Sequence, residues 1–408
     1  MPKKLVICTD GTWNPVEKIT REVRTSTNVA KIAALAAPES TDGMCQIVCY
    51  VQGVGTNEND AISGGAFGWG LSANVEHAYR FLVHNYEPGD ELYLFGFSRG
   101  AYTARSLAGL LRNCGIVTAR KPEMVDDALN LYKDRRNVTD PESIRARVFR
   151  NENSHEAEVR FLGVWDTVGA LGVPCIRHQF AKTLGWDWQF HDTSLGPHIR
   201  HACHALAIHE TRSKFLPTLW TAPEASTQPQ VLEQMWFSGC HSNVGGGYTD
   251  TSLSDIALEW MIQRATEAGL AFVENWQDKL RVSGQGFNPN PMGNINSEFK
   301  GIYPYIDAFR GCPNGVCRQM ELTDQSSAAL CPRPGAAPWL PSMISRIGAS
   351  LRGSATPPPA SGEPRTFEAV HKSVHERYDA KVPGDWWPPG IEALLRKQSQ
   401  SGSNLLRC

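Results

Sequence analysis

Long apolar runs are missing from this sequence: no stretch approaches the roughly 18 residues that a membrane-spanning helix requires. The chain opens on Met-Pro-Lys-Lys and an apolar run too short for the hydrophobic region of a signal peptide. An excess of either charge is also missing, because 40 Lys and Arg stand against 42 Asp and Glu, for a formal net charge of −2. We therefore expect neither a membrane-spanning protein nor one drawn by its overall charge to nucleic acid or anionic lipid.

The cysteines lack the pattern of a disulfide framework. Their number, 11, is odd, and several lie inside apolar stretches, as buried thiols do. Cys312, Cys317 and Cys331 have neither a convincing fourth ligand nor the usual spacing of a zinc site. We therefore expect a cytoplasmic protein that holds no metal, and export without a cleaved signal is compatible with the sequence.

The first two thirds of the chain alternates apolar runs of strand length with segments of helical periodicity. This rhythm is typical of a parallel sheet whose crossover helices cover both faces. It predicts an α/β fold with a mostly parallel central sheet. Five runs carry the prediction, and each ends in small or polar residues: 5–8, 47–51, 92–95, 161–165 and 235–237.

The rhythm fades after about residue 270, which predicts a catalytic core over 1–270 and a C-terminal extension over 271–408 that packs on it. A proline-rich stretch at 332–366 predicts a loop. Within the core, 120–155 is charged and helical and 170–225 is aromatic and polar with no clear strand, so we expect both as lid insertions. We expect the aromatic side chains within 186–190 to pack the second lid on the body; the alternative is contact with an acyl chain or a membrane interface.

A Gly-x-Ser-x-Gly pattern lies between the third apolar run and the helix that follows it. Gly96, Ser98 and Gly100 are its members. In this setting the turn forces the serine into a strained backbone conformation, and only small residues on either side let strand and helix approach. The pattern predicts Ser98 as a nucleophile presented at the carboxyl edge of the sheet, with Gly96 and Gly100 providing the geometry of the turn.

A serine nucleophile needs a histidine base and a carboxylate that orients the histidine. Asp166 follows directly after the fourth apolar run, and His241 follows the fifth. The carboxyl ends of parallel strands meet at one edge of a sheet, where ligands of open α/β sheets bind. The chain order serine, aspartate, histidine is also that of α/β-hydrolases. We predict His241 as the general base and Asp166 as its acid partner.

Each assignment has an alternative. The Ser98 turn can be an ordinary glycine-rich connection, the Asp166 carboxylate can cap the next turn, and a lone histidine is often structural. Other side chains in the later part of the chain could take the two partner roles: Asp192, Asp250, His191, His201, His204, His209 and His371.

The oxyanion of an acyl-transfer intermediate needs backbone N–H donors. The first apolar run ends in Asp10, Gly11 and Thr12, and this loop can aim the N–H of Gly11 or Thr12 at the substrate oxygen. The second expected donor is the N–H of Arg99, which follows the serine. Chemistry of this kind requires no metal and no organic cofactor.

Taken together, an ordered series of motifs resembles the α/β-hydrolase family that includes the catalytic domains of type VI secretion phospholipase effectors. The resemblance implies an α/β-hydrolase fold and a Ser-Asp-His site, made here of Ser98, Asp166 and His241, that acts on carboxylic esters, with phospholipids as the substrates of the effectors. The matching stretches run from residue 5 to about 270, with a weaker echo later: 9–14, 53–56, 96–101, 163–169, 190–193, 204–208, 241–248 and 370–374.

Two positions depart from the family pattern, in which an aspartate is usual where His209 and Asn243 stand. They motivate a second hypothesis, a catalytically silent hydrolase-like binding or scaffold protein. The first hypothesis is a lipid or phospholipid ester hydrolase with transient contact to a membrane surface. A delivery partner and an immunity protein are expected only if the protein is an exported effector.

Overall fold

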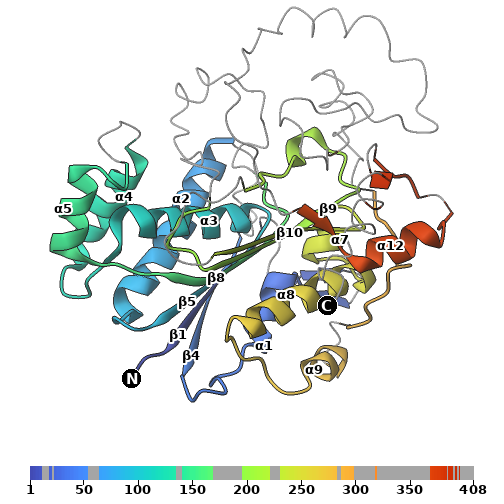
Figure 1. The fold of residues 1–408 in the computed structure, drawn as a ribbon, viewed down its shortest axis with the longest axis horizontal. Coiled ribbons are helices and arrows are strands. Elements are labelled where there is room, and N and C mark those ends of the chain that lie inside the picture. Colours follow the sequence, from blue (N-terminus) through green and yellow to red (C-terminus); the bar gives the residue numbers. More distant parts are fainter. Residues whose placement is uncertain are drawn as a thin grey trace, which may run out of the picture.

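The computed structural model describes residues 1–11, 18–20, 23–53, 64–134, 140–168, 195–220, 230–282, 286–297, 318, 368–383, 385–388, 391–392 and 395. A seven-stranded sheet in the order β11-β10-β9-β8-β5-β1-β4 forms its centre (Figure 1). All neighbouring strands in it are parallel. The strands are β1 (Lys4–Thr9), β4 (Gln46–Val51), β5 (Glu91–Phe97), β8 (Val159–Trp165), β9 (His201–Ala207), β10 (Val231–Phe237) and β11 (Glu368–Val370).

Helices cover both faces of this sheet, as the sequence predicted. Helices α2 (Gly64–Asn85) and α3 (Arg99–Cys114) lie on one face, and α1 (Asn28–Leu35) and α8 (Ser252–Glu267) on the other (Figure 1). Alternate residues of β1 serve the two faces, because Leu5 joins the apolar cluster of α2 and α3 while Val6 joins that of α1 and α8. The sheet order and these layers confirm the predicted α/β class.

The five predicted apolar runs all fall in strands of the central sheet, but two strands of that sheet, β9 and β11, were not predicted. Strand β9 lies inside 170–225, where the sequence indicated no clear strand. That expectation was wrong because His201 and His204 interrupt an alternating pattern of small Ala and Cys residues, and the strand is buried by its neighbours rather than marked by its own apolarity. The remainder of this expected lid, apart from 195–220, lies outside the described residues.

The segment expected as the first lid packs on the body of the protein. Its helices α4 (Val125–Lys133) and α5 (Ile144–Asn153) follow the 3-10 turn η1 (Pro122–Met124), and Val125, Leu129 and Tyr132 join the apolar cluster over α3. A short antiparallel pair, β6 (Ile116–Val117) and β7 (Ser154–His155), closes its base. Whether this segment acts as a lid stays a prediction.

The sheet extends beyond the boundary expected at residue 270. Strand β11 pairs with β10, and α12 (Lys372–Asp379) follows it. Val370 and Val374 pack against Trp236 of β10 and, farther along the chain, Leu395. The end of the chain therefore supplies the edge of the central sheet. Of the remaining 271–408, the structure describes α9 (Trp276–Val282) and a few other stretches, and the loop predicted at 332–366 lies outside them.

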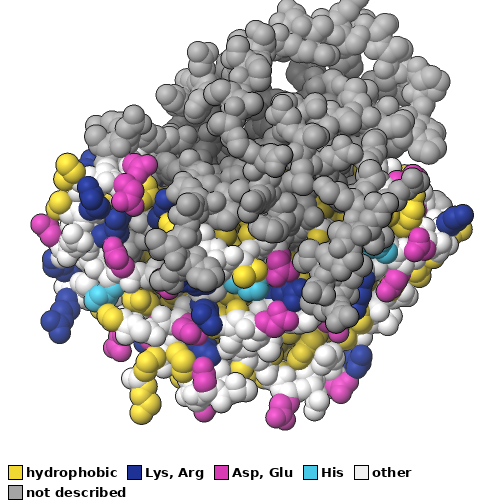
Figure 2. All heavy atoms as spheres, viewed as in Figure 1, with side chains coloured by type: hydrophobic (Ala, Val, Ile, Leu, Met, Phe, Trp, Pro, Cys, Tyr) yellow, Lys and Arg dark blue, Asp and Glu magenta, His cyan; other side chains and the backbone are white. Residues whose placement is uncertain are grey.

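Smaller elements complete the described fold. They are the antiparallel pair β2 (Lys18–Thr20) and β3 (Val23–Thr25), the 3-10 turn η3 (Ser213–Phe215) and the short helix α7 (His241–Gly245). None of the helices that the structure describes combines the length and the apolar character needed to cross a membrane. On the described part of one face, acidic and basic side chains are interspersed, as the balanced composition leads one to expect (Figure 2).

Candidate active site

The turn between β5 and α3 consists of Ser98 alone. Strand β5 ends at Phe97 and α3 begins at Arg99, and Ser98 has φ 58° and ψ −118°, in the region that favours glycine. The turn is tight: a Cβ on Gly96 would lie 2.5 Å from the Gly100 carbonyl oxygen, and one on Gly100 would lie 2.1 Å from that of Thr9. Both positions therefore require glycine, and the predicted nucleophile elbow is the conformation found.

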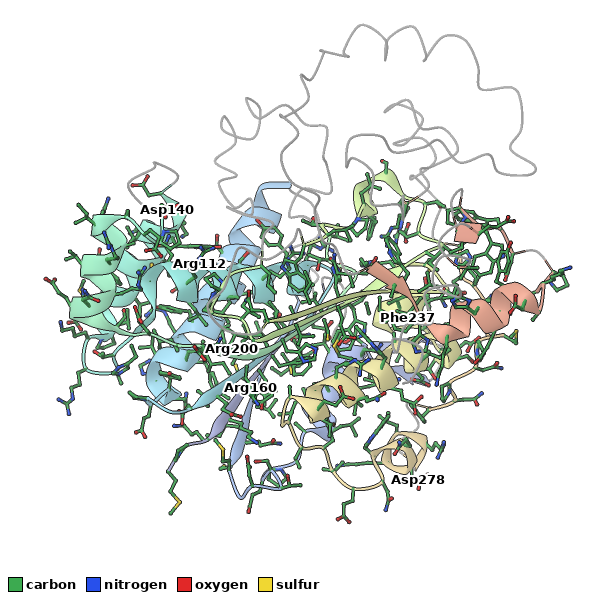
Figure 3. All side chains as sticks on the ribbon, in the orientation of Figure 1. Arg112, Asp140, Arg160, Arg200, Phe237 and Asp278 are labelled. Atoms are coloured by element: carbon green, nitrogen blue, oxygen red, sulfur yellow. The ribbon has the colours of Figure 1, made fainter. Side chains whose placement is uncertain are left out.

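The structure brings Ser98, His241 and Asp166 together at the carboxyl edge of the sheet. His241 Nε2 lies 2.8 Å from Ser98 Oγ, and His241 Nδ1 lies 2.6 Å from Asp166 Oδ2. Ser98 and Asp166 directly follow the ends of β5 and β8, and His241 lies four residues after the end of β10. In Figure 3 the label of Phe237, the last residue of β10, marks the carboxyl edge of the sheet. The label of Arg200, just before the first residue of β9, marks the opposite, amino edge.

The other described histidines have different partners. His201, near the start of β9, bonds Glu233, and His204 Nε2 accepts the backbone N–H of Thr167. His371 caps α12, with Nδ1 accepting the N–H of Ser373. Asp250 accepts from Ser252 at the start of α8. Asp192 and His191 lie outside the described residues.

Asp166 is completely buried, and its carboxylate is held on several sides. The backbone N–H of Ala207 donates to Oδ1 at 3.0 Å, and the Arg318 guanidinium donates to both oxygens, at 2.5 Å to Oδ1 and 2.9 Å to Oδ2. Burial raises the pKa of the Asp166 carboxyl, but the charge of Arg318 and the hydrogen bond from His241 outweigh it and hold the pKa well below its ordinary value. Asp166 is therefore ionised opposite His241.

Arg318 was missed in the sequence. It lies in a stretch without strand or helix rhythm, and nothing in the local pattern distinguishes it from the other 39 basic residues. Its partner is 152 residues earlier in the chain. An alignment of long-range residue pairs, rather than local pattern, is the kind of signal that identifies such a contact.

The His241 ring lies between two phenyl rings. Phe97 is tilted at 34° with centroids 4.6 Å apart, and Phe215 approaches edge-on at 5.0 Å. Burial in this apolar setting lowers the pKa of the His241 imidazole, while the Asp166 carboxylate acts to raise it. The balance favours a neutral imidazole, which is the form that can accept a proton from Ser98.

A buried ion pair between Arg212 and Glu210 contacts the backbone of the same histidine. Arg212 Nε and Nη2 donate to the two carboxylate oxygens of Glu210, at 2.9 and 2.8 Å, and the Arg212 guanidinium stacks over the Phe215 ring at 3.5 Å. The backbone N–H of His241 donates to Glu210 Oε2 at 3.3 Å. The sequence contained one signal for this pair, because both residues follow closely after an apolar stretch at 204–208 that belongs to the family resemblance.

The two departures from the family pattern have local structural roles. His209 Nδ1 accepts the N–H of Gly239 at 2.9 Å, its ring packs against Trp387, and burial lowers its pKa to about 4. Asn243 Oδ1 accepts the N–H of Cys240 and, at 2.9 Å, that of Asn296. The carboxylate beside His241 Nδ1 is that of Asp166, at 2.6 Å.

The expected oxyanion loop contains a second buried carboxyl. Asp10 Oδ2 accepts the hydroxyls of Thr27, at 2.5 Å, and Tyr50, at 2.6 Å, while Oδ1 accepts the N–H of Gly11 at 2.6 Å. Burial raises the pKa of Asp10 to about 6, more than these bonds lower it. The Gly11 N–H is thus engaged within its own loop, Thr12 lies outside the described residues, and Arg99 begins α3.

A second polar cluster lies toward the amino ends of β9 and β10. Its ligand-type atoms, from His201, Cys203 and Glu233, all lie within 4.8 Å of one another. Arg264 Nε donates to Glu233 Oε2 at 3.0 Å, so the carboxylate already has a cationic partner. We assign this cluster to the structure of the sheet edge. The three cysteines weighed for a zinc site lie outside the described residues.

Comparison with known proteins places this geometry in a family context. Residues 3–264 match the family described as the type VI secretion system phospholipase effector Tle1-like catalytic domain. An uncharacterized protein of Saccharomyces cerevisiae is 29% identical over 241 residues, which cover 54% of this chain and 33% of that protein. This chain thus matches about a third of the length of its curated yeast relative.

Two solved structures are similar at low identity. An uncharacterized protein from Pseudomonas aeruginosa has 17% identity and a TM-score of 0.43, covering 100% of this chain and 63% of that one. The Tle1 effector bound to the VgrG spike of the type VI secretion system has 19% identity and a TM-score of 0.32, covering 60% of this chain and 51% of that one. These TM-scores are low, so the fold is assigned from the sheet order described above.

Proposed function

The chain belongs to the family of Tle1-like phospholipase effector catalytic domains, and from this membership we propose that it is a serine hydrolase that cleaves acyl esters of lipids or phospholipids. Membership implies hydrolase chemistry. The observation that supports the serine mechanism is the unbroken chain of contacts from Ser98 Oγ through the His241 ring to Asp166, with distances of 2.8 and 2.6 Å.

In the proposed first step, Ser98 Oγ attacks the ester carbonyl carbon while His241 Nε2 removes the hydroxyl proton. Asp166 accepts the Nδ1–H hydrogen bond and stabilises the imidazolium. When the tetrahedral intermediate collapses, the bond to the alcohol oxygen breaks and His241 returns the proton to that alcohol. An acyl ester on Ser98 remains.

In the second step, water attacks this acyl ester and His241 accepts one of its protons. Collapse releases the fatty acid, and the proton returns to Ser98 Oγ. We propose the Arg99 N–H as one oxyanion donor, because it lies one residue after the nucleophile at the beginning of α3. Gly11 or Thr12 is the proposed second donor; for Gly11, the substrate oxygen must replace Asp10 Oδ1 as acceptor.

We also propose 1–270 as the catalytic core, with 271–408 as a C-terminal extension that packs on it and adds β11 to its sheet. We propose 120–155, and 170–225 apart from strand β9, as coverings of the site. The solved Tle1 effector is bound to a VgrG spike. If this chain is exported by a type VI system, a comparable delivery partner and a neutralising immunity protein are its expected partners. A lipid substrate implies transient contact with a membrane surface.

The test combines a fluorophosphonate probe with hydrolysis of nitrophenyl esters and of phosphatidylcholine and phosphatidylethanolamine vesicles. We expect wild-type protein to be labelled and active, and Ser98→Ala and His241→Ala each to lose about 10³-fold or more of the activity. Vesicle hydrolysis lost in both variants supports a phospholipase, and activity on soluble esters alone supports an esterase. Folded wild-type protein that neither reacts nor hydrolyses would favour the silent binding protein.

A further inference from the structure

One side chain of the candidate site comes from outside the region that matches the family. Arg318 lies beyond residues 3–264, yet its side chain is buried against Asp166. Besides the two bonds to Asp166, Nη1 donates to the Ala207 carbonyl at 2.7 Å and Nη2 donates to the Phe215 carbonyl. The guanidinium is thus fixed by two main-chain oxygens, one at the end of β9 and one in η3, and it faces the carboxylate with both Nη atoms.

We propose that Arg318 is a positioning residue, which holds the Asp166 carboxylate against His241, so that the C-terminal part of the chain completes the active site. The inference rests on the proposed function and deepens it. Asp166 Oδ2 is the shared atom, because it accepts from His241 Nδ1 at 2.6 Å and from Arg318 Nη2 at 2.9 Å.

The physical reason is the geometry of a guanidinium opposite a carboxylate. Two parallel N–H bonds fix both the position and the plane of the carboxyl group, whereas a single donor leaves it free to rotate. Asp166 also has a positive φ of 41°, so its backbone is held in an uncommon conformation. The Ala207 N–H is the other described donor to Oδ1. Without Arg318, the buried carboxylate loses its cationic partner and the two hydrogen bonds that fix its plane.

The same cation must influence proton uptake at the site. Asp166 and Glu210 favour the imidazolium form of His241, and Arg212 opposes it. On the side of Asp166, the facing groups are Arg318, His241 and the neighbouring His204. With Asp166 ionised, the proton that the site takes up on acidification binds His241 Nε2, and a fixed positive charge nearby disfavours this uptake. Arg318 therefore keeps the site in its base form down to lower pH.

The experiment measures kcat/KM on a soluble nitrophenyl ester from pH 4.5 to 8.5, with the full chain as wild type, Arg318→Met and Arg318→Lys. We expect Arg318→Met to lower kcat tenfold or more and to move the acid limb of the profile up by about one pH unit. Arg318→Lys keeps the positive charge but cannot make the two parallel hydrogen bonds of a guanidinium. We therefore expect the acid limb at its wild-type position and a kcat between those of wild type and Arg318→Met.

Arg377 offers a matched control. It too is buried and makes two bonds to one carboxylate, Asp385, at 2.7 and 2.8 Å, and two to main-chain carbonyls, of Pro291 and Gly293. Arg377→Met therefore removes an equivalent set of contacts away from the triad. We expect it to reduce thermal stability and to leave the acid limb in place.

A folded Arg318→Met protein with an unmoved acid limb would overturn the proposal. If that variant does not fold, Arg318→Lys carries the test, since an upward shift in a protein that keeps the charge contradicts the argument. Failure of the proposed hydrolase function is separate, because wild-type protein would then be inactive. In that case the pKa of His241 is followed by NMR of ring-labelled histidine in Ser98→Ala protein, with and without Arg318→Met, and an unchanged pKa overturns the inference.

Discussion

Two strand ends at the same edge of the sheet hold buried aspartates in opposite electrostatic states. Asp10 follows β1 and is 2% exposed, and Asp166 follows β8 and is 0% exposed. The pKa of Asp10 is raised to about 6, whereas that of Asp166 lies well below its ordinary range. Burial acts on both in the same direction, so burial does not explain the difference.

The partners explain it. Asp10 receives two hydroxyls and one backbone N–H, all neutral donors, and together they offset only part of the cost of burying a charge. Asp166 receives a guanidinium and an imidazole besides its backbone donor. The buried Asp166 carboxylate therefore stays ionised because a cation faces it, while Asp10, which has only neutral donors, can take up a proton near pH 6.

The largest expected effect separates the two aspartates by function. Asp166→Asn presents an amide to His241 Nδ1 and leaves Arg318 without its anion, so we expect kcat on a soluble ester to fall about 10³–10⁴-fold. Asp10→Asn replaces the carboxyl by an amide of the same shape at a position that takes no part in the proposed proton transfer. We expect its kcat to stay within about tenfold of wild type. Equal losses in the two variants, both folded by circular dichroism, would contradict the distinction.

The next effect concerns the residue that joins the two regions. A Cβ at Gly100 would lie 2.1 Å from the Thr9 carbonyl oxygen and 2.6 Å from that of Asp10, so Gly100→Ala must push the Asp10 loop and the Ser98 turn apart. We expect kcat to fall about 10²-fold or more, because small misplacements of a nucleophile are costly. The reaction rate of Ser98 with a fluorophosphonate measures the same displacement directly.

Gly109 in the same helix serves as the control. A Cβ there would approach the Tyr132 hydroxyl at 2.7 Å, and that side-chain end can move. Gly109→Ala should keep the activity and the labelling rate within about threefold of wild type. If the two alanine variants lose activity alike, the close approach at Gly100 is not the cause.

The smallest effect is on the free energy of unfolding, and the direction in which it changes with pH distinguishes the two kinds of carboxyl group. Because the folded protein raises the pKa of Asp10 from 3.8 to about 6, its stabilising contribution is complete below about pH 3.8 and is lost as pH rises through about 6. Asp10→Asn removes this loss, and its amide can donate to the two hydroxyls that now donate to the carboxylate. Relative to wild type, the variant should gain up to roughly 3 kcal/mol between pH 4 and 7.5 in urea unfolding.

Asp42 makes a contribution to stability that depends on pH in the opposite direction. This exposed carboxyl has a pKa lowered to about 2 by the Ser40 hydroxyl and by Lys4, so its contribution is present above pH 3.8 and is lost as pH falls through about 2. Asp42→Asn should therefore lose a little stability at neutral pH. A difference between wild type and Asp10→Asn that does not grow as pH rises would show that Asp10 is not protonated in the folded protein.

Much of the fold and of the proposed site could be predicted from local pattern. The apolar runs at 5–8 and 92–95 fall in strands because buried parallel strands are continuously apolar. Strand β9 was missed because its own residues carry little of that signal, and β11 because it is three residues long. The order of Ser98, Asp166 and His241 along the chain predicted that they meet, and in the structure they do.

The sequence by itself determined the elbow at Ser98, since only glycine fits two residues before and two residues after it, and it determined which strand ends bear the groups of the proposed triad. Only the tertiary structure decided the charge of those groups. Ionisation of a buried carboxyl depends on what faces it, and the residues that face Asp166 and Asp10 come from distant parts of the chain, Arg318 and His241 for one, Thr27 and Tyr50 for the other. No local pattern carries that information, because folding alone creates those neighbours.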